Sequence, residues 1–225
     1  MRTYRILTLG LILICTNLLY GQKYDFFLDR YTYHKNNLSR PASSDNDYAD
    51  VEGSPYLNPE FAEGIVYLKD STAYKMPLRY NMFSNEMEYQ LNNLTYTIGN
   101  PNAVQQILLG ESVFIYDPKV NDGGYFELLQ SGKCSLLLKR SVHYQPSEGP
   151  KPIEGTITPA KFIKESDRFY LRHGTNGVYA VENKKVLLTA MDDHRSEIES
   201  YIKTEKTRIS KREDLRKLVA YYNSL

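Results

Sequence analysis

The stretch that decides the fold is residues 64–91, which read GIVYLKDSTAYKMPLRYNMFSNEMEYQL. Residues 65–69 and 74–81 have strand character and are separated by a short polar connection at 70–73, the pattern of a β-hairpin. Pro77 has no backbone N–H to donate, so we expect it at a sheet edge or at a bulge. These two runs therefore predict a pair of antiparallel strands.

Strand patterns continue beyond this hairpin. Residues 86–91 alternate, which places one set of side chains on one face, Met87, Tyr89 and Leu91, and a polar set on the other, Glu86, Glu88 and Gln90. Further runs with strand character occur at 94–98, 104–109, 112–116, 125–129, 133–144, 161–163, 169–172 and 178–181. Glycine- and asparagine-rich turns separate many of them. Because parallel strands need long crossovers, we expect an antiparallel sheet or sandwich of many short strands.

The periodicity becomes helical near residue 184. A first helix is expected to place near one face the residues Leu187, Leu188, Met191, Arg195, Ile198 and Ile202, with the stem of Arg195 along that face. Ser210 and Glu213 have the spacing of a capping box for a second helix, whose apolar stripe is Leu215, Leu218, Val219 and Tyr222. The predicted fold class is mainly β (α+β), with two C-terminal helices.

The start of the chain has the layout of a secretory signal peptide at residues 1–21, because Arg2 and Arg5 precede a short apolar run. That run is shorter than the roughly 20 apolar residues that a membrane-spanning helix needs. We therefore expect cleavage after Gly21 and no membrane-spanning segment afterwards. A lipoprotein signal at Cys15 is disfavoured, since the residue before it is not small. The expected location is periplasmic or secreted.

Two regions follow the signal. Residues 22–62 are polar, with little periodicity, and are expected to form an extended lead-in. Residues 63–225 are expected to form a single β-rich domain that ends in a helical segment at about 184–225. A chain of this size can bury one sizeable core.

Charge and cysteine content exclude several classes of protein. The chain has 28 Lys and Arg against 27 Asp and Glu, and two of the basic residues lie in the signal. A near-neutral mature chain is not expected to bind nucleic acid, which requires a basic surface. Cys134 is the one cysteine beyond the signal, so an intramolecular disulfide is not possible. Its apolar neighbours indicate a small buried hydrophobe rather than a reactive thiol.

No metal or cofactor motif stands out. The four histidines are scattered, without the spacing of a zinc site: His34, His143, His173 and His194. The acidic residues of one polar stretch do not follow the EF-hand spacing: Asp45, Asp47, Asp50 and Glu52. Adjacent residues on a helix point in different directions, so Asp192, Asp193 and His194 are interpreted as helix surface. We predict no metal and no cofactor.

Two groups of residues are candidates for function. Glu86 and Glu88 emerge on the same face of one strand, roughly 7 Å apart, a separation that inverting glycosidases use. The alternative is that both are ordinary solvent-facing residues. Arg79, Tyr80 and Asn81 are the candidate binding patch, since arginine and tyrosine suit interaction surfaces. There is no Gly-x-Ser-x-Gly nucleophile motif.

The chain also resembles a known group of proteins. The stretches that carry the resemblance are residues 53–58, 77–81, 86–88, 159–162 and 213–225. They are similar to a group of exported proteins of Gram-negative bacteria. The resemblance spans most of the mature chain and implies one intact exported module, but it transfers no activity and no site residues.

Two hypotheses remain open. The first is an exported, non-enzymatic module that binds a protein or another component of the cell envelope. The second is a periplasmic hydrolase acting on glycan or peptide, with Glu86 and Glu88 as catalytic candidates. The expected partner is thus an envelope protein or a glycan. A convergent polar pocket with perturbed carboxylates would favour the hydrolase, whereas a tyrosine-rich face or an exposed sheet edge would favour the binding module.

Overall fold

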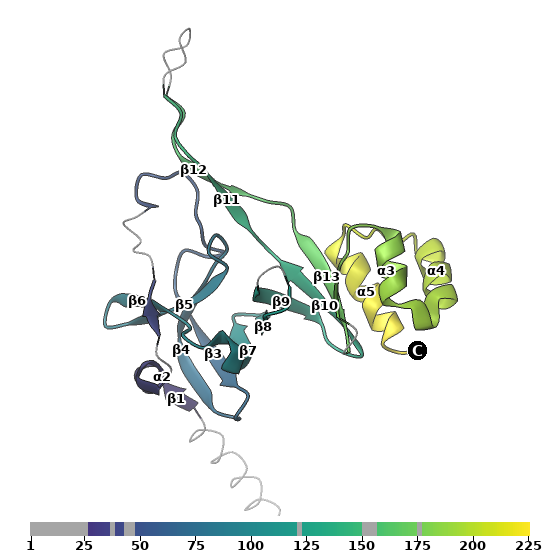
Figure 1. Cartoon of the computed structure of the whole chain (residues 1–225), viewed down its shortest axis with the longest axis horizontal. Helices are drawn as coiled ribbons and strands as arrows, with labels where there is room; N and C mark the ends of the chain where they lie inside the picture. Colours follow the sequence, from purple (N-terminus) through teal and green to yellow (C-terminus); the bar gives the residue numbers. More distant parts are fainter. Residues whose placement is uncertain (1–26, 37–38, 43–47, 121–122, 150–156, 175–176) are drawn as a thin grey trace, which may run out of the picture.

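Most of the strands belong to one long, curled, mainly antiparallel sheet (Figure 1). The computed structural model describes residues 27–36, 39–42, 48–120, 123–149, 157–174 and 177–225. The predicted signal peptide at 1–21 lies outside these residues. The structure is 42% strand and 23% helix, which confirms the mainly β class predicted from the sequence.

The 12-stranded sheet follows the chain order closely. From one end to the other its strands are β14 (Val178–Ala180), β13 (Arg168–His173), β10 (Cys134–Lys139), β9 (Gly124–Gln130), β8 (Ser112–Asp117), β7 (Val104–Leu109), β3 (Ala62–Leu68), β4 (Ala73–Asn81), β5 (Glu86–Leu91), β6 (Leu94–Thr97) and β2 (Arg40–Pro41). Neighbours in this order pair antiparallel. Off this path, β1 (Phe27–Asp29) pairs in parallel with β4.

Local sequence explains how neighbouring strands are joined. β5 and β6 are connected by Asn92 and Asn93, whose φ angles are 51° and 61°. Asparagine tolerates this left-handed conformation, which a two-residue hairpin turn requires. Pro77 lies inside β4, opposite Glu63 of β3. On its other flank, β4 pairs with β1 as far as Lys75 and with β5 from Leu78, so Pro77 lies at the junction between two partner strands.

The N-terminal part of the sheet curls around its own core. β5 contacts β9, and the apolar side chains of β3 to β8 fill the interior between them. A helix, α2 (Arg30–Asn36), packs against β4 and β5 and inserts Tyr33, which is fully buried. The region expected to be an extended lead-in therefore contains a helix that contributes to the core.

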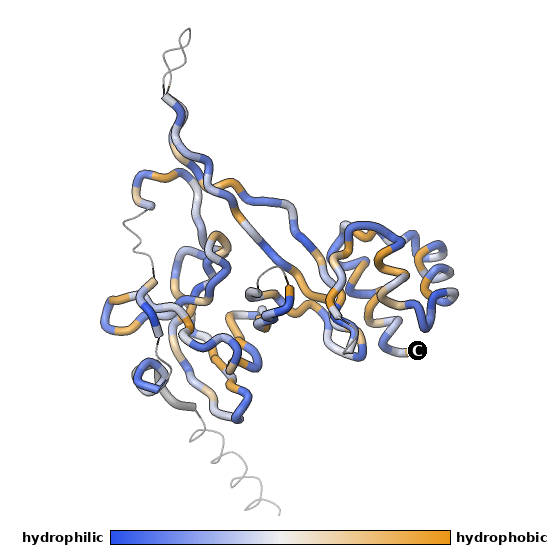
Figure 2. The backbone as a smooth tube through the Cα atoms, in the orientation of Figure 1, coloured by the Kyte–Doolittle hydropathy of each residue, from blue (hydrophilic) through white to orange (hydrophobic). Residues whose placement is uncertain are grey.

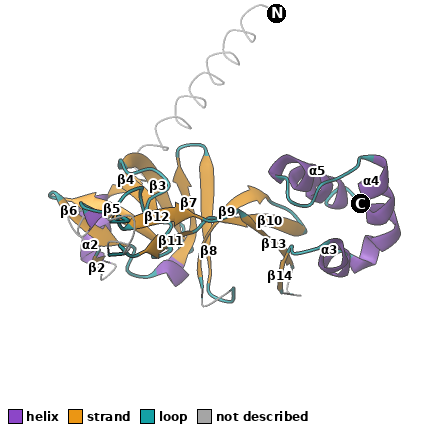
Figure 3. Ribbon diagram, turned by 90° about the horizontal axis from the view of Figure 1, so that it is seen from above, coloured by secondary structure: helices purple, strands orange, loops and turns teal. Residues whose placement is uncertain are grey.

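The C-terminal helices cover the other end of the sheet (Figure 3). They are α3 (Lys184–Ala190), α4 (Arg195–Thr204) and α5 (Arg212–Tyr222). Their apolar faces form a second core with β9, β10 and β13. Figure 2 shows apolar residues concentrated in the strands and in these helices.

Two details of the helical segment differ from the sequence predictions. The first expected helix is interrupted by a 3-10 turn at Asp192–His194, and Arg195 lies exposed beside Asp192 and Glu199 instead of along the apolar face. The second helix has no side-chain cap, so the predicted capping box is wrong. Instead, Asp214 of its first turn accepts a hydrogen bond of 3.0 Å from the backbone N–H of Arg208.

A buried carboxylate attaches α5 to the sheet. Glu127 of β9 is 4% exposed, and its two oxygens lie 2.7 Å from guanidinium nitrogens of Arg212 and of Arg140. Burying a carboxylate is costly unless it is paired. The two arginines supply that pairing and connect the helical layer to β9.

The run predicted as one strand over 133–144 is broken at Arg140 and Ser141. Beyond the break the chain forms a separate two-stranded ribbon of β11 (Val142–Gln145) and β12 (Lys161–Lys164). The backbones of Glu148 and Thr158 extend the pairing with two hydrogen bonds of 3.0 and 3.2 Å. The ribbon projects away from the sheet (Figure 1).

Candidate functional site

A buried polar cluster surrounds Arg79. Its Nε donates to Glu88 Oε2 at 2.8 Å, and Asn81 Nδ2 donates to the other oxygen of Glu88 at 2.9 Å. The guanidinium also donates to the Tyr56 hydroxyl at 2.8 Å. Its central carbon lies 3.7 Å and 4.3 Å from the ring centroids of Tyr56 and Phe61. Every group in the cluster thus has a defined partner within the fold.

Strand register explains this cluster. Arg79 of β4 lies directly opposite Glu88 of β5, so the two side chains meet on one face of the sheet. The chain before β3 then runs beside the end of β4, where Leu57 donates its N–H to the Tyr80 carbonyl at 3.0 Å. That segment places Tyr56 over Arg79. Residues 53–61, most of which belong to the expected lead-in, therefore cover the ion pair.

The three residues expected as a binding patch do not form an exposed surface. Arg79, Tyr80 and Asn81 are all buried. Because they alternate along β4, Arg79 and Asn81 face the Glu88 cluster, whereas Tyr80 points to the interior and packs against Phe114 with a centroid distance of 5.1 Å. A small cavity of about 160 Å³ lies beside them, lined mainly by apolar groups.

The two carboxylates considered for catalysis also lie in different environments. Glu88 is 1% exposed, and both of its oxygens accept hydrogen bonds from Arg79 and Asn81. The expectation that it faces solvent is wrong. Glu86 is partly exposed and forms an ion pair with Arg40 of β2. The structure therefore brings only Glu86 to an accessible cavity.

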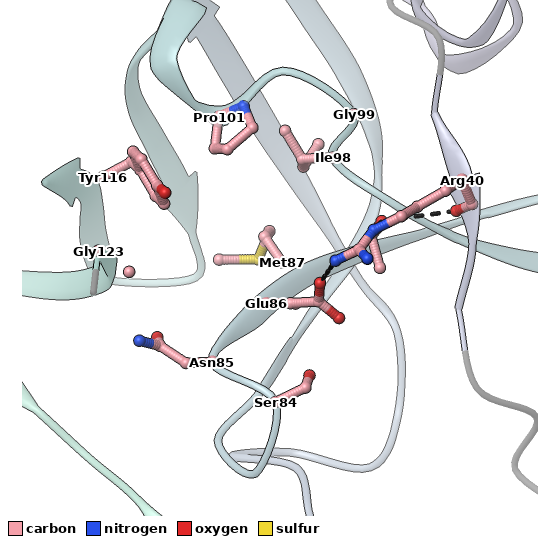
Figure 4. A pocket seen from close by; sticks show the side chains of 12 residues that line it. Arg40, Ser84, Asn85, Glu86, Met87, Ile98, Gly99, Pro101, Tyr116 and Gly123 are labelled. Atoms are coloured by element: carbon pink, nitrogen blue, oxygen red, sulfur yellow. Dashed lines mark hydrogen bonds and ion pairs between the residues drawn. The ribbon is translucent and has the colours of Figure 1, made fainter. Parts of the chain in front are cut away.

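This cavity has a volume of about 310 Å³ and lies between β2 and β5 on one side and β8 with the start of β9 on the other (Figure 4). Arg40 and Glu86 lie on one side of it, and Tyr116 of β8 and Pro101 lie on the other. Met87 is part of its lining. Small-molecule sites have volumes from roughly 300 Å³ upward, so the cavity is large enough for a small polar ligand.

Asn85 connects the β4–β5 turn to β9 at this cavity. Its Oδ1 accepts hydrogen bonds from the Tyr80 hydroxyl at 2.8 Å and from the Tyr125 N–H at 3.1 Å. Its φ of 56° suits asparagine. A Cβ atom at Gly124 would overlap the Asn85 amide, so glycine is needed there. The β4–β5 turn is thereby fixed to the start of β9.

Sequence reasoning identified Glu86 but missed the other polar residues of the cavity. Arg40 lies in the lead-in, where no periodicity marks it, and it reaches Glu86 across 46 positions of chain. Asn85 carried a signal that could have been used, because asparagine in a short turn often adopts positive φ. Tyr116 is the last residue of the predicted strand at 112–116, and no pattern in that run marks it as a site residue.

A second accessible feature is an aromatic cluster at the base of the projecting ribbon. The ring of Phe162 lies 5.1, 5.3 and 5.6 Å, centroid to centroid, from the rings of Tyr48, Phe83 and Tyr144. Phe162 is buried, but Phe83 and Tyr144 are 44% and 43% exposed, and Ile157, farther along the ribbon, is 68% exposed. We call Phe83, Tyr144 and Ile157 the arm patch.

Asp193 and His194 do not lie on a regular helix surface. Asp193 accepts hydrogen bonds from Lys133 Nζ at 2.6 Å and from the Tyr222 hydroxyl at 2.7 Å. His173 lies 2.9 Å from the same hydroxyl. Within the described part of the chain, no three His, Cys, Asp or Glu side chains are grouped so that they could hold a metal ion. Asp45 and Asp47 lie outside the described residues.

The Asp193 contacts predict a pH-dependent contribution to stability. The hydrogen bond from Lys133, with that from Tyr222, lowers the pKa of Asp193 from 3.8 to about 2. A depressed carboxyl pKa stabilises the fold above the unfolded-state pKa, and this contribution is lost as the pH falls from about 4 to about 2. Asp193 is 42% exposed, so we expect Asp193→Asn to cost less than about 1 kcal/mol at neutral pH.

Urea unfolding of wild type and Asp193→Asn, from neutral pH to about pH 2, tests this pH-dependent contribution of Asp193 to stability. The difference in unfolding free energy should shrink across the acid range, and Asp192→Asn, on the exposed pair with Arg195, is the control. A difference that stays constant with pH would contradict the assignment.

The remaining findings concern the helices, Cys134 and the comparison with known proteins. None of the helices in the described ranges is long and apolar enough to span a membrane. Cys134 is fully buried, and this burial raises the pKa of its thiol to about 12.

Comparison of the chain with protein-family models, with curated proteins and with solved structures gives no match in any of the three.

Proposed function

We propose that this protein is an exported, non-enzymatic module that binds a protein of the cell envelope through the arm patch. The observation that carries the proposal is that two exposed aromatic side chains, Phe83 and Tyr144, lie against one buried ring at the base of a ribbon that projects from the sheet, with the exposed Ile157 farther along that ribbon. Of the five large hydrophobic residues exposed among those the structure describes, three belong to the arm patch. Single exposed hydrophobics are ordinary, but a group of them marks an interaction surface.

The cluster has the physical features of a binding hot spot. Tyr144 and Phe83 are held by the buried ring of Phe162, so their positions are defined before a partner arrives. Rigid aromatic side chains lose little conformational entropy on binding and bury a large apolar area. Ile157 would extend the contact along the ribbon.

Charge and carboxylate placement favour binding over the other classes considered. The near balance of acidic and basic residues supports a protein partner over nucleic acid. A two-carboxylate hydrolase would need both groups to face one cavity, but Glu88 is enclosed with Arg79 while Glu86 lines the cavity. No other observation favours hydrolysis.

A crosslinking pull-down with the tagged full chain, expressed in cells of its own source and analysed by mass spectrometry, tests the proposal. We expect one envelope protein to be recovered reproducibly, and Tyr144→Ser or Ile157→Ser to reduce its recovery at least about fivefold, as hot-spot residues contribute more than ~1 kcal/mol. Leu94→Ser is the matched control, because Leu94 is 59% exposed on the β5–β6 hairpin. Recovery that is equal for all variants, or no recovered partner, would contradict the proposal.

A further inference from the structure

We propose that the cavity between Glu86 and Tyr116 binds a neutral sugar unit. This second site is formed by β2, β5, the end of β6, β8 and the start of β9, and not by the β11–β12 ribbon. The inference therefore goes beyond the proposed protein-binding function and can fail independently of it.

The charge of the cavity selects a neutral ligand. Among the described residues that line it, the charged ones are Arg40 and Glu86, which pair with each other, so this part of the lining has no net charge. An anion such as phosphate would need unbalanced positive charge, and an amine would need an unpaired carboxylate. Neither is provided here.

The polar groups suit a ligand with several hydroxyls. A carboxylate can accept about four hydrogen bonds and a guanidinium can donate five, so the Arg40–Glu86 pair keeps the capacity to bind further groups. Arg40 is held in place by a second contact, since its Nε donates to Thr97 Oγ1 at 3.2 Å. A sugar hydroxyl, which both donates and accepts, matches a wall that presents both a donor and an acceptor.

The opposite wall suits the less polar face of a sugar ring. Tyr116 presents an aromatic ring that is fixed by an edge contact with Tyr125, with ring centroids 5.3 Å apart. Its hydroxyl lies so close to Gly123 that a Cβ there would come within 2.8 Å of it. A ring held in place before binding loses little entropy when a ligand stacks on it. The two walls together favour a ligand with one polar edge and one flat face.

The size of the cavity is consistent with one or two sugar rings. Its volume of about 310 Å³ lies at the lower end of the range of small-molecule sites, roughly 300–1,000 Å³. Met87 and Ile98, both buried, add apolar surface beside the polar walls.

Ligand-observed NMR with the full mature chain tests the inference. The probes are N,N′-diacetylchitobiose, maltose and cellobiose, with tri-alanine and inorganic phosphate as competing classes. We expect at least one saccharide to bind with a Kd below about 10 mM, and Glu86→Gln and Arg40→Met each to weaken that binding about tenfold, equivalent to ~1.4 kcal/mol. Both side chains are partly or largely exposed, so neither change should unfold the protein.

Matched controls separate this inference from the proposed function. Glu63→Gln removes an exposed carboxylate that pairs with Lys75 on another part of the sheet and should leave saccharide binding unchanged. Tyr144→Ser should also leave it unchanged while reducing recovery of the protein partner. The inference is overturned if no saccharide in the panel binds, if tri-alanine or phosphate binds instead, or if Glu86→Gln and Arg40→Met bind the saccharide as tightly as the wild type.

Discussion

Replacement of Arg79 by methionine is expected to lower the free energy of unfolding by about 3–5 kcal/mol, because it leaves a buried carboxylate without its cation. Glu88 is 1% exposed, and Arg79 Nε is its charged partner at 2.8 Å. The change also removes the donor to the Tyr56 hydroxyl and the stacking of the guanidinium on two rings. Equilibrium unfolding in urea, followed by far-UV circular dichroism, measures the loss.

Two further variants show whether the uncompensated charge of Glu88 causes the loss of stability in Arg79→Met. Lys75→Met breaks the exposed pair with Glu63 and should cost less than about 1 kcal/mol. The double variant Arg79→Met with Glu88→Leu should recover much of the loss, since apolar side chains of similar volume often replace a buried ion pair at little cost. An Arg79→Met protein within about 1 kcal/mol of wild type would show that Glu88 finds another partner.

This prediction changes how a binding experiment on Arg79 should be interpreted. If Arg79→Met lowers stability, a loss of partner binding in that variant cannot be assigned to a lost contact, because the fold itself is affected. The arm patch and the cavity do not share this difficulty. Tyr144 and Ile157 are exposed, and Arg40 is 71% exposed, so their replacement tests binding with little effect on the core.

The strands could be predicted because side-chain alternation and turn composition are local signals. The period-two runs at 65–69, 74–81 and 86–91 correspond to β3, β4 and β5, and Asn92 with Asn93 forms the turn that leads into β6. Each of these signals depends on residues that are close in the sequence. Local patterns of this kind determine which segments are strands and often which strands pair.

The environment of the carboxylates could not be predicted in the same way. Alternation shows that Glu86 and Glu88 share a face, but not whether that face is covered. Glu88 is buried because the chain at 53–61 lies against Arg79, a contact between segments separated by about twenty residues. The hairpin register did contain a usable signal, since an arginine lies directly opposite a glutamate. The sequence alone gave no reason to expect an aromatic cover over that pair.

The cavity depends on contacts that are still longer in range. It forms where β5 meets β9 and where β2 meets β6, so its residues come from four separate parts of the chain. The break in the first C-terminal helix has a similar origin. Met191 continues the helical pattern in the sequence, but its fully buried side chain packs in the second core where the chain turns. Tertiary packing overrides local propensity at both places.

Replacement of Tyr33 by alanine is expected to cost about 3–5 kcal/mol, the range observed when a large buried aromatic side chain is removed. Tyr33 is fully buried, and its ring makes edge contacts with Tyr74 and Tyr89 at centroid distances of 5.0 and 5.6 Å. α2 therefore acts as part of the core and not as a lead-in. Urea unfolding of Tyr33→Ala, with the exposed Tyr144→Ala as the matched control, measures the difference. A loss no greater than that of the control would mean that the sheet closes its core without α2, and that the helix is a surface addition.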